Sequence, residues 1–319
     1  MNRPLYSRRD VLAGISLLPA PLWRVTGPLY EPKLVAHTQI WLLEARRRRT
    51  ALSDLVEEAF SGTHRAGYRR VELVSEFLDP PMRDNSLRLL KRHKLEPAVV
   101  SFERSLQMGE AADNSRREVL AAARVARDFG ASAIALTPYP IDCEPQKSEE
   151  QIHFESFFFT SLGQELRGLG MELLLHHSLP DMRDRAWRWK RVIAAVEPSL
   201  VSVCLDLDLA LTAGLDPLAL LNETMNRLGG LHLRSTRNGA PMEELGEGDI
   251  DMMRVAKMLR QAFYRGYLSV DLRPDIRTEP RQSVAMSLYR SRKFMQEVFA
   301  PRPGFLPVDM GPHVRLKGL

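Results

Sequence analysis

Eight short runs of apolar and β-branched residues recur along the chain, and helical sequence separates them. The runs cover residues 34–40, 70–74, 97–102, 132–136, 171–175, 201–205, 230–233 and 268–272. Polar residues rarely alternate with apolar ones inside these runs, which is typical of parallel strands that are buried on both faces. Because eight such strand and helix units follow one another, the pattern favours a closed barrel over an open sheet.

The sequence between the runs supports this alternation. Several stretches place apolar residues three or four positions apart, which gives a helix one apolar face. The first such face is formed by Leu52, Leu55, Val56, Ala59 and Phe60. Asp216 before Pro217 is a typical helix start, and Asp251 precedes another helical stretch in the same way. We therefore predict an α/β fold, a single (β/α)8 TIM barrel over residues 31–300, followed by a C-terminal tail over 301–319.

An N-terminal leader precedes the predicted barrel. Residues 7–12, which contain Arg8 and Arg9, resemble a twin-arginine export signal, and a modest apolar segment follows them. That segment is too short to form a stable membrane span. We expect residues 1–30 to be a leader that directs the protein through the twin-arginine export machinery to the periplasm. A cytoplasmic protein with a basic leader is the alternative, because no clear cleavage site follows Pro21.

Composition narrows the classes of partner. The chain carries 45 basic and 40 acidic residues, but four arginines and one aspartate in residues 1–25 account for three of its five net positive charges. The remaining surplus of about +2 is too small to indicate a nucleic-acid partner. Cys204 lies in an apolar run and is expected to be a buried core thiol, whereas Cys143 lies in a polar stretch. A disulfide between them is left open, so the cysteines do not settle the compartment.

Four of the apolar runs end at or near side chains of the kinds that bind metals. They are His176, Asp206, His232 and Asp271. The carboxyl ends of parallel barrel strands meet at one face, where such barrels gather their chemistry. A carboxylate at the end of a buried strand must be paired, hydrogen-bonded or metal-bound to tolerate the loss of water. Each residue also has a structural alternative. Asp206 could instead cap a helix, His232 could occupy a core position, and Asp271 could form a salt bridge. His176 could belong to a polar loop start, in which case His177 could be the residue that faces inward.

Five phrases in a fixed order resemble the sugar phosphate isomerase/epimerase family of xylose isomerase-like barrels. They are AGYRRVEL (66–73), LDLDLALTAGLDP (205–217), LGGLHLRS (228–235), LGEGDIDM (245–252) and YRGYLSVDLRP (264–274). The resemblance covers about residues 34–299 and implies a divalent metal at the carboxyl face of the barrel. It also implies metal-assisted proton transfer next to a sugar carbonyl. Family members bind the metal through Glu, Asp, His and Glu of the fifth to eighth strands, slots that His176, Asp206, His232 and Asp271 fill here.

The chain departs from the family pattern at both Glu positions, where His176 and Asp271 stand. Those positions commonly act as acid and base in the family, so the resemblance makes Asp271 the first catalytic candidate and His176 the second. Candidate substrate-binding residues are Glu72, His177, Arg234 and Arg237. The alternatives are a paired interior carboxylate for Glu72 and surface positions for the two arginines. Two imidazoles and two carboxylates suit Mn²⁺, Co²⁺, Zn²⁺ or Fe²⁺ better than Ca²⁺.

The sequence thus predicts an exported, metal-dependent isomerase or epimerase that acts on a small carbohydrate through an enediolate. A degenerate barrel that binds a sugar without converting it is the first alternative. A zinc-dependent endonuclease-like barrel is a more remote one. The sugar, the metal and the oligomeric state, including a homo-oligomer, stay open.

Changing Arg8 and Arg9 together to lysine should abolish export, because the export machinery reads the arginine pair as an address. Deleting residues 1–30 should leave the barrel folded, since the apolar stretch of the leader shows no pattern that could join the core. Cell fractionation measures the first effect, and circular dichroism of the truncated protein measures the second. Unaltered periplasmic delivery of the double variant would contradict the targeting prediction.

Overall fold

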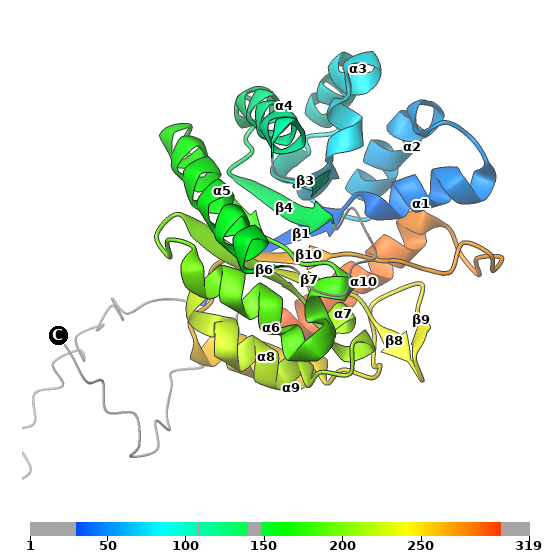
Figure 1. Ribbon diagram of the computed structural model, residues 1–319. Coiled ribbons are helices and arrows are strands. Elements are labelled where there is room, and N and C mark those ends of the chain that lie inside the picture. Colours follow the sequence, from blue (N-terminus) through cyan, green and yellow to red (C-terminus); the bar gives the residue numbers. More distant parts are fainter. Residues whose placement is uncertain (1–29, 107–108, 140–147, 301–319) are drawn as a thin grey trace, which may run out of the picture.

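Eight parallel strands close into a barrel in the computed structural model, which describes residues 30–106, 109–139 and 148–300 (Figure 1). In chain order the barrel strands are β1 (Lys33–His37), β2 (Arg70–Val74), β3 (Glu96–Ser105), β4 (Ala133–Tyr139), β5 (Glu172–Leu175), β6 (Val201–Asp206), β7 (Leu228–Leu233) and β10 (Tyr267–Val270). Each barrel strand pairs with the one before and after it in the chain, and β10 pairs with β1 to close the ring. The predicted single (β/α)8 barrel is confirmed for these residues.

Helices cover the outside of the barrel (Figure 1). They are α1 (Gln39–Arg48), α2 (Leu52–Arg65), α3 (Pro80–Arg92), α4 (Glu110–Arg127), α5 (Glu149–Gly168), α6 (Leu179–Ala195), α7 (Leu207–Thr212), α8 (Pro217–Thr224), α9 (Met252–Gln261) and α10 (Val284–Phe299), with 3-10 turns η1 (Ser75–Leu78) and η2 (Met225–Arg227). A short antiparallel hairpin follows β7 and consists of β8 (Thr236–Arg237) and β9 (Ala240–Pro241). These strands do not belong to the barrel.

Local sequence signals fix two of the helix starts. The Asp216 carboxylate accepts hydrogen bonds from the backbone N–H groups of Leu218 and Ala219 at the start of α8. The Asp251 carboxylate accepts one from the N–H of Arg254 at the start of α9. Both caps were predicted from the sequence and are confirmed, as is the apolar face of α2, which is buried in the core except at its first residue.

The interior of the barrel is layered. An apolar cluster at its centre consists of Val35, Ala98, Val99, Ala133, Ala135, Leu174, Cys204 and Tyr267. Because side chains alternate between the two faces of a strand, a residue two positions further along points to the same side. His37, His176 and Asp206 each lie two positions after a member of this cluster. The cluster therefore forms an apolar floor beneath a layer of polar side chains at the carboxyl end.

Several predictions lie outside the described residues. The undescribed residues 1–29 and 301–319 contain nearly all of the predicted leader and the whole predicted tail. Cys143 also lies outside the described residues. The leader, the tail and the export route therefore stay predictions. Cys204 is buried with a free thiol, which confirms the expectation of a core cysteine. Within the described ranges, no helix combines the length and the apolar character needed to cross a membrane.

Gly163 in α5 allows the helix to approach the chain segment before β6. A Cβ atom at Gly163 would lie 2.6 Å from the carbonyl oxygen of Leu200, whereas one at Gly168 in the same helix would meet nothing within 4 Å. Gly to Ala in a helix gains about 1 kcal/mol in propensity, but overpacking costs about 1–3 kcal/mol. We expect Gly163→Ala to lower the free energy of unfolding by up to about 2 kcal/mol, and Gly168→Ala to leave it unchanged or raise it. Urea unfolding measures both. Shifts of the same sign would show that the contact with Leu200 does not limit this position.

Candidate active site

Six buried polar residues lie in the carboxyl-terminal halves of six neighbouring barrel strands, β5, β6, β7, β10, β1 and β2, or just beyond their ends. They are His37, Glu72, His176, Asp206, His232 and Asp271, here called the polar ring, and each is at most 4% exposed. Burying so many polar groups is unfavourable unless they satisfy one another. The structure meets this requirement with two connected sets of contacts, one centred on Glu72 and one on Arg234.

The Glu72 carboxylate joins two histidines across the barrel. Its oxygens Oε1 and Oε2 each lie 3.1 Å from Nε2 of His232, and Oε1 lies 3.4 Å from Nε2 of His37. Nδ1 of His37 accepts a hydrogen bond from the N–H of Gln39, so its proton is on Nε2, toward Glu72. Burial alone would raise the pKa of Glu72, but His232 and His37 outweigh it and lower that pKa to about 2. Glu72 is therefore a buried, paired carboxylate, the alternative considered for it from the sequence.

Arg234 holds three carboxylates together. Its guanidinium lies 2.9 Å from Asp206 Oδ2, 2.9 Å from Asp208 Oδ2 and 3.1 Å from Asp271 Oδ2. Nε of Arg273 lies 2.9 Å from the same Asp271 oxygen. Although burial would raise the pKa of Asp271, Arg273, His37 and Arg234 hold it far below its usual range. Arg234 is thus an interior residue and not a surface one.

Asp206 and Asp271 both adopt the structural arrangements considered as alternatives from the sequence. Oδ1 of Asp206 accepts hydrogen bonds from the N–H groups of Asp208 and Leu209 and so caps α7. Asp271 is in salt bridges with Arg234 and Arg273. These contacts engage both oxygens of Asp206 but one oxygen of Asp271. The two carboxylates therefore differ in what they can still bind.

The charges of the site are unequal. Four carboxylates, those of Glu72, Asp206, Asp208 and Asp271, stand against the two guanidinium groups of Arg234 and Arg273. Two negative charges remain before any histidine is protonated. Burial works against a positive charge on His232, but Cys204 and Glu72 outweigh it and place the pKa of His232 well above 6.5. A protonated imidazole or a divalent cation would reduce the same surplus.

The structure separates the roles of the adjacent histidines at the end of β5. His176 faces the ring of His232, with ring centroids 4.5 Å apart, and its Nδ1 lies 3.0 Å from the hydroxyl of Thr137. His177 is fully buried on the other side, where its Nε2 accepts a hydrogen bond from the N–H of Asp206. Burial lowers the pKa of His177 to about 4, so its imidazole is neutral at pH 7. His176 is therefore the inward-facing residue, and His177 supports the backbone at the end of β6.

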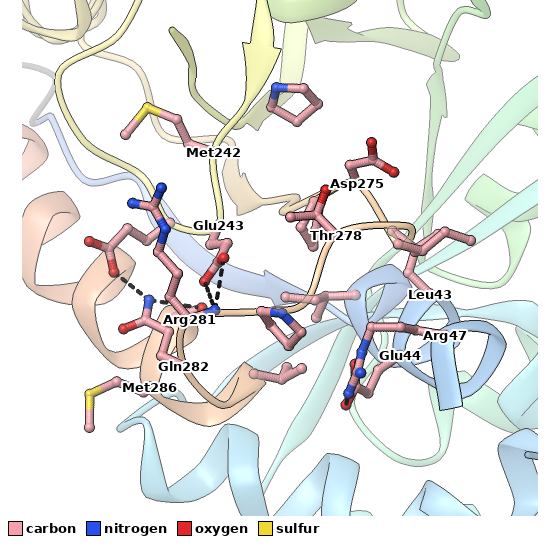
Figure 2. Close-up of a pocket in the computed structure, with 18 of the residues that line it drawn as sticks. Leu43, Glu44, Arg47, Met242, Glu243, Asp275, Thr278, Arg281, Gln282 and Met286 are labelled. Atoms are coloured by element: carbon pink, nitrogen blue, oxygen red, sulfur yellow. Dashed lines mark hydrogen bonds and ion pairs between the residues drawn. The ribbon is translucent and has the colours of Figure 1, made fainter. Parts of the chain in front are cut away.

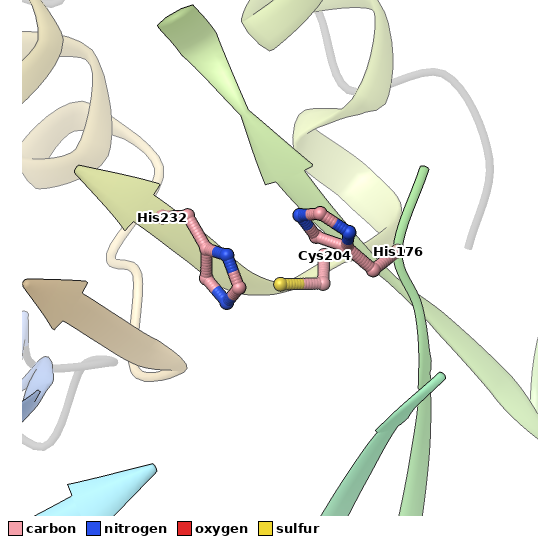
Figure 3. Close-up of side chains that lie close together, drawn as sticks. All are labelled: His176, Cys204 and His232. Atoms are coloured by element: carbon pink, nitrogen blue, oxygen red, sulfur yellow. The ribbon is translucent and has the colours of Figure 1, made fainter. Parts of the chain in front are cut away.

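Several ring residues keep a donor atom that could hold a metal ion. His176 Nε2, His232 Nδ1 and Asp271 Oδ1 are buried and have no hydrogen-bond partner among the described residues. Donor atoms lie within 4.8 Å of one another in two groups, His176–Cys204–His232 (Figure 3) and His37–His232–Asp271. Both groups share His232, and neither of these groups of described residues includes Asp206. The donor types and the charge surplus suit a divalent cation, but the four predicted ligands do not form one group, and that set stays a prediction.

The structure also has a pocket of about 620 Å³ (Figure 2). It is lined by α1, the β8–β9 hairpin, the loop after β10 and the start of α10, and the polar ring is not part of its described lining. Arg237, a predicted substrate contact, lines this pocket and donates a hydrogen bond to the carbonyl of Glu247. Glu243 accepts hydrogen bonds from the N–H of Arg281 across it. We place the chemistry in the polar ring, because the buried titratable groups converge there.

Sequence reasoning missed several residues of the site. Cys204 was expected in the core, and His37, Asp208 and Arg273 were not among the predicted site residues. A usable signal was the two-residue spacing of side chains on one strand face. Cys204 lies two positions before Asp206, and Arg273 lies two positions after Asp271.

Comparisons with known proteins agree with the observed fold. A family model described as a xylose isomerase-like TIM barrel matches residues 60–291. An inosose dehydratase of Lacticaseibacillus casei is 22% identical over 245 residues, which cover 69% of this chain and 82% of that protein. A sugar phosphate isomerase/epimerase structure from Parabacteroides distasonis has a TM-score of 0.66 at 15% identity, over 86% of this chain and 96% of its own. An L-ribulose 3-epimerase structure has a TM-score of 0.66 at 16% identity, over 84% and 94%.

Two further structures of this fold contain metal ions. One of them holds zinc. It is 15% identical to this chain, with a TM-score of 0.60 over 84% of this chain and 98% of its own. A barrel protein from Mycobacterium smegmatis, 14% identical with a TM-score of 0.60 over 78% and 90%, holds magnesium. At such identities the likeness shows the fold. The metal preference of this chain depends on its own donor atoms.

Replacing Arg234 by methionine should expose its function as a counter-charge. The variant leaves Asp206, Asp208 and Asp271 buried without their shared cation, and breaking a buried ion pair from one side costs about 3–5 kcal/mol. Asp271 stabilises the wild type above its unfolded-state pKa, and without Arg234 its folded-state pKa rises, so the deficit should be largest near pH 7 and smaller near pH 5.

Urea unfolding at both pH values measures this difference. Arg277→Met is the matched control, because Arg277 is exposed and pairs with Asp275, and exposed ion pairs contribute little to stability. Equal losses for the two variants, or a deficit at position 234 that ignores pH, would contradict the counter-charge role.

Proposed function

This chain belongs to the xylose isomerase-like TIM barrel family, and from that premise we propose that it is a metal-dependent isomerase or epimerase of a sugar or sugar derivative. The reaction removes a proton from the carbon next to a carbonyl group, and the resulting enediolate is protonated again at the other face or at the neighbouring carbon. Such a reaction needs a base beside the substrate and a positive charge for the enediolate oxygen.

The observation that carries the proposal is the free oxygen of Asp271. Its Oδ2 is fixed by Arg234 and Arg273, while Oδ1 is buried without a hydrogen-bond partner in the described part of the chain. A carboxylate held in one orientation with a free lone pair can accept a proton from a substrate above the barrel floor. The two guanidinium groups keep Asp271 ionised, but they also make it a weaker base, so we expect slow turnover.

The other ring residues support this base. Glu72 fixes the orientation of the His232 ring through Nε2, and Thr137 does the same for His176 through Nδ1. A divalent ion on the remaining imidazole nitrogens would polarise the substrate carbonyl and stabilise the enediolate. His176 is the second candidate for proton transfer whenever its Nε2 is not used as a ligand. Arg273 is half-buried beside Asp271 and suits a contact with a substrate hydroxyl.

The similar proteins support a polyhydroxylated carbonyl compound as the substrate. One is described as acting on an inosose and one on L-ribulose. The dehydratase relative also favours a second candidate, in which the same proton is removed and a hydroxyl group on the next carbon then leaves as water. The two outcomes share the first step and differ in the product. A barrel that binds such a compound without converting it is the competing non-catalytic function.

Proton exchange tests the proposal directly. Metal-loaded protein in deuterated water should incorporate deuterium into at least one member of a panel of ketoses and inososes. Asp271→Asn should lower the exchange rate by about 10²–10⁴-fold, the usual contribution of a general base. Asp271→Glu should retain metal binding, and Asp128→Asn, at an exposed aspartate far from the ring residues in sequence, is the control.

Product analysis then separates isomers from a dehydrated product. Exchange that survives Asp271→Asn would remove Asp271 as the base. A wild type that holds its metal and binds a sugar, yet exchanges no proton across the panel, would favour the sugar-binding function.

A further inference from the structure

Cys204 is the one member of the apolar floor that offers a metal-binding atom. It lies on β6, is 2% exposed, and its side chain faces the barrel interior two positions before Asp206. Its thiol is free. A buried cysteine alone is an ordinary core residue. The surroundings of its sulfur make this one different.

The neighbouring strand leaves space for the Cys204 sulfur. Cys204 is in register with Gly230 on β7, and a Cβ atom at Gly230 would lie 2.9 Å from Sγ. Two positions further along β7 stands His232, whose ring faces the sulfur (Figure 3). The glycine thus keeps open the side of the barrel on which the sulfur and the imidazole approach each other.

Two histidines present to the same region nitrogens that have no hydrogen-bond partner among the described residues, although His232 Nδ1 also lies 3.7 Å from Asp271 Oδ2. Nδ1 of His176 is engaged by Thr137, and Nε2 of His232 is engaged by Glu72. The opposite nitrogens, His176 Nε2 and His232 Nδ1, are buried and lack a hydrogen-bond partner within the described ranges. An imidazole whose far nitrogen is held by a hydroxyl or carboxylate is the usual arrangement of a metal ligand, because the second contact fixes ring orientation and tautomer. Donor atoms of Cys204, His176 and His232 lie within 4.8 Å of one another.

The carboxylates above this group are less available. Asp206 uses Oδ1 to cap α7 and Oδ2 to pair with Arg234. Asp271 Oδ2 is shared by Arg234 and Arg273. A cation that bound Asp206 Oδ2 or Asp271 Oδ2 would compete with the buried guanidinium of Arg234, and Asp271 Oδ1 is the atom that the proposed function assigns to the substrate proton. A cation beside Cys204 Sγ avoids that competition and is still attracted by the negative charge of the nearby carboxylates.

We propose that the barrel binds its metal ion through a thiolate, with Cys204 Sγ, His176 Nε2 and His232 Nδ1 as protein ligands. Binding replaces the thiol proton, which passes to solvent as the sulfur–metal bond forms. A thiolate and two imidazoles select Zn²⁺ or Co²⁺ over Mg²⁺, Mn²⁺ and Ca²⁺. Three protein ligands leave a fourth position for water or a substrate oxygen, the pattern of catalytic zinc sites. The proposal deepens the metal assignment of the proposed function, but it is tested without substrate.

Cobalt absorption provides the test. Metal-free protein carrying Cys143→Ser, so that Cys204 is the one cysteine, is titrated with Co²⁺. We expect intense near-ultraviolet absorption from thiolate-to-cobalt charge transfer, together with visible bands of a tetrahedral site. Cys204→Ser and Cys204→Ala should each remove the near-ultraviolet absorption and weaken Co²⁺ binding by roughly 100-fold or more, beyond the 10- to 100-fold that loss of a supporting residue costs. Mg²⁺ in excess should not displace the cobalt.

Two control variants separate this site from a carboxylate site. Asp206→Asn should keep the charge-transfer absorption, since asparagine can still cap α7 and the residue is not a ligand in this proposal. His153→Asn changes an exposed histidine on α5 and should also leave the absorption unchanged. His176→Asn should weaken binding and alter the visible bands.

The spectrum of the Cys143→Ser protein decides the matter even if a Cys204 variant fails to fold. Cobalt binding without charge-transfer absorption, or lost in Asp206→Asn and retained in Cys204→Ser, would overturn the proposal. Absence of cobalt binding by the folded protein would overturn it too. Charge-transfer absorption in a protein that exchanges no substrate proton would leave the thiolate site standing and count against the proposed function alone.

Discussion

The buried guanidinium of Arg234 is the interaction on which the site depends. It ties together the carboxylates of Asp206 at the end of β6, Asp208 at the start of α7 and Asp271 just after β10, and the last of these lies far from the other two in the chain. Burying any one of these carboxylates alone would be costly, and the shared cation makes all three tolerable. Because each of its nitrogens faces a different aspartate, the guanidinium also fixes the spacing of the strand ends. The geometry of the polar ring follows from that spacing.

The site combines fixed charges with unused donor atoms. Arg234 and Arg273 hold Asp271 by one oxygen, and Glu72 holds His232 by one nitrogen, so each of these groups has one atom held by hydrogen bonds and one without a hydrogen-bond partner among the described residues. This arrangement orients a side chain while keeping its chemistry available. Asp206 differs, because both of its oxygens serve the scaffold. The substrate and the metal ion that we propose use the first kind of group.

The fold could be predicted from the sequence, because apolar runs and helix caps are local signals. The eight strands and the caps at Asp216 and Asp251 depend on neighbouring residues, and the structure has them where the pattern put them. Membership of the site could be predicted in part, since strand ends converge in a barrel. The contact partner of each side chain in the site could not be predicted. Whether Asp206 meets a metal, a backbone amide or a guanidinium depends on Arg234, which is 28 positions away and reaches it only through the pairing of β6 with β7.

The closure of the barrel by β1 and β10 sets the order in which the site can form. Lys33 pairs with Tyr267, so the first and last barrel strands join across most of the chain. A nascent chain that has not yet passed β10 lacks the strand that β1 needs, and it lacks Asp271 altogether. Contacts between such distant segments form late in folding, because closing the long intervening loop costs entropy before the contacts stabilise the chain. During synthesis, the partly formed barrel therefore stays open beside β1, which carries His37, until β10 has been made.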